Sequence, residues 1–138
     1  MRTYLGQPSG RDLLAKFISG SCVAMRTAKL HGKVGFYFES GWVNKHREDE
    51  QVHRKSYNLV ITYTGEPILV IHYELNKTFS IEMSEKEIDR VEDMMANAAL
   101  KIIFGFGIIY IIKTSTEQGI GFSEYMLESN DKRFLSLN

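Results

Sequence analysis

His72 and Glu74 form the arrangement in this chain that is closest to acid–base chemistry. Residues 68–75 alternate in the manner of a strand, so His72 and Glu74 should share one face with Ile68 and Val70. A carboxylate beside an imidazole can orient it for proton transfer. Such a pair is more often an ordinary solvated or interface contact. We therefore assign no catalytic residue, and we keep an enzyme or ligand-binding fold that uses His72, Glu74 or Cys22 as an alternative.

The remaining motifs favour a protein that is not an enzyme. Cys22 is the single cysteine, and a nucleophilic thiol needs an adjacent base that the sequence does not identify, so we interpret it as a small buried hydrophobe. The GFG at 105–107 and the GIG at 119–121 lack the third glycine of a dinucleotide-binding loop. No phosphate-loop motif is present. We expect no cofactor.

A polar stretch contains two further histidines. His46 and His53 are seven positions apart and flank the acidic run 48–50. This spacing matches no zinc signature, and ligands in a flexible loop would not be preorganised. We expect no metal, and we interpret residues 44–56 as an exposed loop or a short solvated helix because their only aliphatic residue is Val52.

Charge is distributed unevenly, although 17 basic and 17 acidic residues give the 138-residue chain a formal net charge of zero. Residues 1–35 carry six basic residues and one acidic residue, whereas residues 66–99 carry three basic and eight acidic residues. These segments either neutralise each other within the fold or form separate surfaces, of which the basic one would bind an anionic partner. The residues proposed for this basic surface are Lys29, His31, Lys33, Tyr37, Lys45, Arg47, Arg54 and Lys55.

The apolar run IIFGFGIIYII, residues 102–112, is the one segment that suggests a membrane. Eleven residues are too few to span a bilayer as a helix, which needs about 20. The first residues also lack the apolar region of a signal peptide. We expect no membrane contact and a cytoplasmic location.

Periodicity and capping residues predict the elements that would position these side chains. Apolar residues at spacings of three and four, each series preceded by a capping serine, predict two helices, near 9–19 and 84–104. The strands that we predict from alternating or wholly apolar segments are 22–29, 33–39, 57–64, 68–75, 79–83 and 108–112, and residues 119–127 fit either a last strand or a short helix.

Together these elements predict a single α+β domain over residues 1–138. It would consist of an antiparallel sheet of about five to seven strands packed against one long helix, about 84–104, and a short N-terminal helix. We interpret the chain as a non-enzymatic binding protein that acts on another macromolecule, such as an inhibitor, an immunity protein or a viral or phage-type accessory factor. We expect a protein partner and self-association as a homodimer. The alternative is a single-stranded nucleic-acid-binding protein that uses a basic, aromatic β-hairpin.

Overall fold

The computed structural model describes residues 9–19, 23–47, 50–77, 84–119 and 123–127. Within them the chain forms a four-stranded sheet in the order β1 (Val34–Arg47), β2 (Glu50–Tyr63), β3 (Glu66–Lys77) and β4 (Glu124–Leu127). The first three strands are antiparallel, and β4 runs parallel to β3. The predicted α+β class is confirmed, whereas the prediction of five to seven antiparallel strands was wrong because the described sheet is smaller and mixed.

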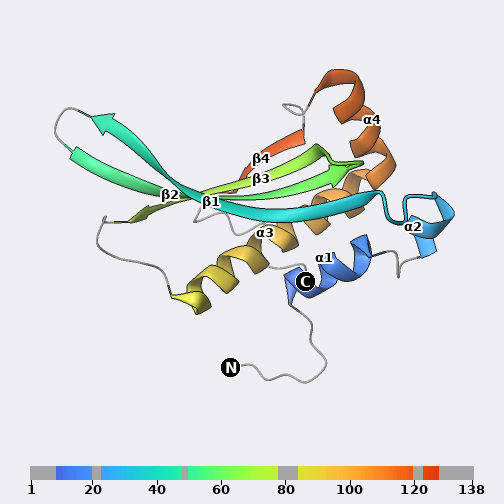
Figure 1. Ribbon diagram of the computed structural model, residues 1–138, viewed down its shortest axis with the longest axis horizontal. Coiled ribbons are helices and arrows are strands. Elements are labelled where there is room, and N and C mark those ends of the chain that lie inside the picture. Colours follow the sequence, from blue (N-terminus) through green and yellow to red (C-terminus); the bar gives the residue numbers. More distant parts are fainter. Residues whose placement is uncertain (1–8, 20–22, 48–49, 78–83, 120–122, 128–138) are drawn as a thin grey trace.

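Helices cover one face and one end of this sheet. They are α1 (Gly10–Ile18), α2 (Val23–Thr27), α3 (Glu85–Phe106) and α4 (Ile108–Gln118). Figure 1 shows α3 lying along one face with α1 beside it, while α4 stands at the end of the sheet where β1 and β3 begin. A hydrogen bond of 3.2 Å from the Ser115 hydroxyl to the Pro67 carbonyl ties α4 to β3.

The core lies between the sheet and α3. Alternate residues of the two central strands point into this core. Examples are Leu59 on β2 and Ile71 on β3, which are register partners and are at most 1% exposed. They meet Met95 and Leu100 of α3, which are equally buried. The other residues of these strands belong to the opposite face, where His72 and Glu74 are half-buried. A strand has a side-chain period of two, and this separation into faces follows from it.

Both helices predicted from capping residues are confirmed. Ser9 caps α1 by accepting a hydrogen bond from the Asp12 N–H at 3.2 Å, and Asp12 in turn accepts from the Ser9 N–H. Ser84 caps α3 in the same way through the Glu87 N–H, also at 3.2 Å. Serine side chains satisfy amides that a helix leaves without a partner in its first turn. The long helix continues past the predicted end at residue 104 and stops at Gly107.

Two segments predicted as strands are helices. Residues 23–27, within the predicted strand 22–29, form the single turn of α2. Residues 108–112, predicted as a buried strand, begin α4, in which Ile108 and Ile111 are buried whereas Ile109 and Tyr110 are exposed. An unbroken apolar run carries no period, so it does not distinguish a strand from a helix.

The prediction that residues 44–56 form an exposed loop or a short solvated helix was wrong as well. Most of it belongs to a long hairpin, in which Asn44 pairs with His53 and Arg47 with Glu50. Strands pair through hydrogen bonds between their backbone groups, so this hairpin forms without an apolar face on its side chains. The strand alternative is confirmed for residues 124–127, which form β4, while the predicted strand 79–83 lies outside the described residues.

Candidate binding surface

The predicted basic surface is divided between the two ends of the sheet. Lys29, His31 and Lys33 are exposed in the connection between α2 and β1. Arg47 ends β1, the 14-residue strand that begins at Val34. At about 3.3 Å per residue, the two ends of this strand are roughly 45 Å apart.

The other members of the predicted surface lie at the far end or on different faces. Lys45 and Arg54 belong to the hairpin end, where the structure describes their backbone. Tyr37 is 46% exposed, and it shares a sheet face with its register partner Val60. Lys55 belongs to the opposite face, where its ammonium group is 6.0 Å from the ring centre of Tyr57. The eight residues therefore do not form one continuous surface.

The contact predicted between His72 and Glu74 is present. His72 Nε2 is 3.1 Å from Glu74 Oε1, and Nδ1 is 2.6 Å from Asn58 Oδ1. Asn58 comes from β2, where it is the register partner of His72. These groups cross-link neighbouring strands on the face opposite α3. A general base also needs a place for substrate within reach, and neither His72 nor Glu74 lines the groove described next.

A small groove separates the sheet from the first half of α3. Its volume is about 140 Å³. Three apolar side chains line it, namely Phe38, Ile88 and Met95. The rest of the lining is polar or carries a phenol, namely Glu39, Ser40, Lys55, Tyr57 and Glu92. Drug-sized and cofactor sites occupy roughly 300–1,000 Å³, whereas a cavity of about 150 Å³ holds a benzene ring. This groove therefore fits one side chain of a partner better than a cofactor.

Two buried tyrosines, Tyr57 in the groove lining and Tyr73 on β3, allow their burial to be tested at high pH. Burial raises the pKa of Tyr57 above the ordinary value of 10.0, and the charges of Glu87 and Glu92 raise it further. Burial also raises the pKa of Tyr73, whose ring centre is 6.5 Å from that of Tyr57. The folded protein thus holds both phenol protons to a higher pH than the unfolded chain does. Their contribution to stability is complete below pH 10 and is lost as the pH rises through the two folded-state pKa values.

We expect Tyr57 and Tyr73 to ionise above pH 10, together with unfolding. Phenolate absorbance should be followed beside circular dichroism from pH 9 to 13, for the parent and for Tyr57→Phe and Tyr73→Phe. Each variant should reduce the late phenolate step. Ionisation of these two tyrosines near pH 10 in a protein that stays folded would contradict the prediction.

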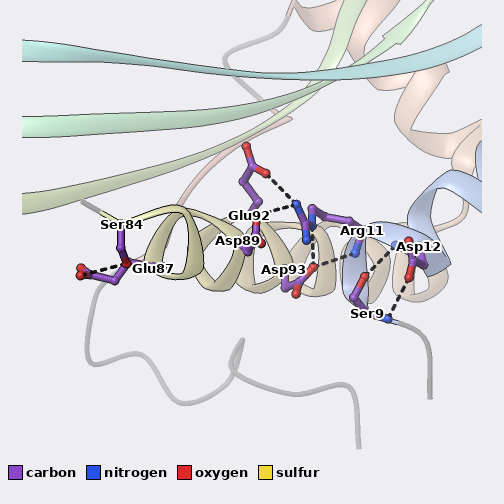
Figure 2. Close-up of polar contacts among 8 residues, drawn as sticks. All are labelled: Ser9, Arg11, Asp12, Ser84, Glu87, Asp89, Glu92 and Asp93. Atoms are coloured by element: carbon purple, nitrogen blue, oxygen red, sulfur yellow. Dashed lines mark hydrogen bonds and ion pairs between the residues drawn. The ribbon is translucent and has the colours of Figure 1, made fainter. Parts of the chain in front are cut away.

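A cluster of ion pairs joins the basic N-terminal segment to the acidic long helix. Arg11 of α1 contacts Asp89, Glu92 and Asp93 of α3 at 3.0, 3.1 and 2.9 Å. Figure 2 shows its guanidinium group among the three carboxylates. Partial burial lowers the pKa of Arg11, but the hydrogen bonds and charges of these carboxylates outweigh that effect and raise it. At this point the two charged segments neutralise each other within the fold, as one of the two interpretations expected.

Among the side chains whose exposure the structure describes, four of the eight exposed large hydrophobic ones lie at the elbow between α3 and α4. Phe104, Phe106, Ile109 and Tyr110 are each 54–65% exposed, and we call these four residues the elbow patch. Half-exposed aromatic and large aliphatic side chains offer on the order of 100 Å² each. The four side chains thus present roughly 400 Å² in total, and among them the rings of Phe106 and Tyr110 are in direct contact.

The backbone bend at Gly107 and contacts between aromatic rings fix the position of the elbow patch. The α3 and α4 axes differ in direction by 91°, and Gly107 makes the bend with φ +91° and ψ 138°. Phe104 packs edge-to-face on Phe17 of α1 at 5.5 Å, and Phe106 stacks on Tyr110 at 5.7 Å. The exposure of these four residues was not predicted from the sequence. Of the two glycines in the run, Gly107 was the signal of a bend.

Two further observations concern the described part of the chain. There, no single helix is long and apolar enough to cross a membrane, whereas the bent pair α3 and α4 would suffice by length and composition alone. No three histidine, cysteine or acidic side chains in the same residues are placed to hold a metal ion. Cys22 lies outside this part, and so do residues 48–49 of the acidic run.

Comparison with known proteins found no relative. No protein-family model matches the sequence, no curated protein is similar to it, and no solved structure resembles the fold. The function must therefore be inferred from the surfaces just described.

Proposed function

We propose that this protein is a non-enzymatic binding protein that recognises another protein through the elbow patch and that also self-associates. The exposure of Phe104, Phe106, Ile109 and Tyr110 at one bend carries this proposal. Aromatic anchors at the centre of an interface supply most of the binding energy in protein complexes. A role as an inhibitor, an immunity protein or an accessory factor is consistent with such a surface.

The size and rigidity of the elbow patch support this function. A standard interface buries about 800 Å² on each partner, so four exposed side chains that present roughly 400 Å² in total can supply apolar contacts within one, with polar groups around them. Buried Ile108 and Ile111 hold α4 from beneath. Anchors that are already fixed lose little conformational entropy when they bind.

Nucleic-acid binding has less support from the arrangement of charge. A single-strand binder tracks the phosphate backbone with a continuous basic groove, whereas Lys33 and Arg47 lie at opposite ends of β1. Three acidic side chains, Glu39, Glu66 and Glu124, are exposed on the described strands. We therefore treat a nucleic acid as an outcome of the test.

The test compares three tagged proteins in lysate of the source cells. They are the parent, the elbow variant Phe106→Ser with Tyr110→Ser, and the control Val23→Ser with Met126→Ser, whose residues are exposed apolar side chains outside the elbow. The parent and the control should retain the same protein. The elbow variant should bind that purified protein about 30-fold or more weakly, as expected for loss of central anchors.

Retention of equal affinity by the elbow variant would contradict the proposal. Co-purification of nucleic acid, with affinity that falls as salt rises, would replace it with the alternative function. Circular dichroism of each variant controls for misfolding.

A further inference from the structure

The outer edge of β1 is long and regular, and in the described part of the chain no strand pairs with it. β1 has 14 residues and occupies one end of the sheet order. Its register with β2 runs without interruption from Val34 to Arg47, whereas β2 and β3 shift register between Ile61 and Thr62. β1 contains no proline. Sheet edges usually carry prolines, bulges or other obstacles that prevent pairing, and this edge lacks the first two.

The far end of β1 belongs to a two-stranded arm. Pairing of β2 with β3 begins at His53, so residues 50–52 pair only with β1. In Figure 1 this arm projects beyond the helix layer, at the end of the sheet opposite α4. Two-stranded ribbons are at best marginally stable in water. Another strand along β1 would give the arm the support that its own chain does not supply there.

The charges along β1 favour a second copy of the same strand in the antiparallel direction. The first half, residues 34–40, carries Glu39 as its only charged residue, and Glu39 is exposed. The second half, residues 41–47, carries Lys45 and Arg47 and no acidic residue. Antiparallel pairing places the acidic half of each copy beside the basic half of the other, whereas parallel pairing places like charges together. Opposite charges across neighbouring strands stabilise a sheet.

We propose that two copies of this protein pair through antiparallel β1 strands, about a two-fold axis near residues 42–43, to form one continuous sheet. In this register Glu39 of each copy lies beside Lys45 or Arg47 of the other. Figure 1 shows α1 nearer to the beginning of β1 than to its far end, so the two copies of α1 would lie at opposite ends of the joined strands. The proposal gives an interface to the self-association in the proposed function, and it is independent of partner binding at the elbow.

Charge reversal tests the pairing in the full-length chain. Native mass and sedimentation should be measured over a range of concentrations for the parent, for Glu39→Lys, for Lys45→Glu with Arg47→Glu, and for the three changes combined. The first two variants should weaken the dimer about 10-fold or more, because two symmetric attractions become repulsions, and the combined variant should restore it. Glu124→Lys on β4 is the matched control and should have no effect.

Spin labels test the geometry in a Cys22→Ser background. A label at Ser40 should lie within about 20 Å of its counterpart, whereas a label at Lys33 should lie roughly 60 Å from its own, since each residue from the axis adds about 6.6 Å. A parent that stays monomeric at all concentrations would overturn the proposal. Loss of the dimer in the elbow variant with retention in Glu39→Lys would also overturn it, because the elbow would then be the interface.

Discussion

Replacing Gly107 by alanine is expected to lower the free energy of unfolding by about 2–3 kcal/mol and to weaken partner binding at the elbow patch. Gly107 has φ +91° and ψ 138°, a conformation that residues with a Cβ rarely adopt and that costs them about 1–3 kcal/mol. It also connects the two helices, since its N–H donates to the Ile103 carbonyl and its carbonyl accepts from the Ile111 N–H. Alanine favours helical φ and ψ at this position, so α3 would tend to continue into α4.

Such a continuation would remove Ile108 and Ile111 from the core, where they are 9% and 4% exposed. The matched control is Gly105→Ala in the same elbow. Gly105 lies within α3, and a Cβ there meets no atom within 4 Å. This change should raise stability by about 0.5–1 kcal/mol, the difference between glycine and alanine inside a helix. Denaturant unfolding measures both variants, and equal stabilities would show that the bend does not depend on the backbone of Gly107.

Replacing Gly10 by alanine is expected to lower the free energy of unfolding by about 2–3 kcal/mol. A Cβ at Gly10 would lie 2.5 Å from the Asp93 carbonyl oxygen and 2.5 Å from Asn97 Oδ1. The Asn97 side chain can rotate away, but the carbonyl belongs to the backbone of α3. The two helices would have to separate, and overpacking of this kind costs about 1–3 kcal/mol. Separation would also lengthen the contacts of Arg11 with Asp93.

A double variant identifies which of the two close contacts dominates. Asn97→Ala in the Gly10→Ala background removes the side-chain contact and leaves the carbonyl contact unchanged, so it should recover only part of the lost stability. Urea unfolding of the two single variants and the double variant completes the thermodynamic cycle. A Gly10→Ala protein as stable as the parent would contradict the close approach of α1 and α3.

The features that were predicted correctly depend on residues near one another in the chain. The capping pairs Ser9 with Asp12 and Ser84 with Glu87 lie three positions apart, so local spacing was enough to locate both helices. The contact of His72 with Glu74 follows from the two-residue period of a strand. Local signals such as these do not require knowledge of the tertiary fold.

The errors involve features that local spacing does not encode. The polar segment 44–56 is extended because its backbone pairs across the hairpin, and its side chains carry no pattern for that pairing. Lys33 and Lys45 were assigned to one surface, but the length of β1 separates them. The exposure of Ile109 and Tyr110 depends on which side of α4 faces the core, where Ile108 and Ile111 are buried. An unbroken apolar run does not reveal that side.

The parallel pairing of β4 with β3 delays completion of the sheet while the chain is being synthesised. Val70 on β3 pairs with Glu124 on β4, so the two partners are more than fifty residues apart in the chain. Residues 78–127 must be synthesised before β4 can cover β3, which takes roughly 3–10 s at about 5–20 residues per second. Throughout that interval the outer edge of β3 can pair with other chains. The amount of protein that reaches the native state in a cell should therefore depend on translation speed between β3 and β4.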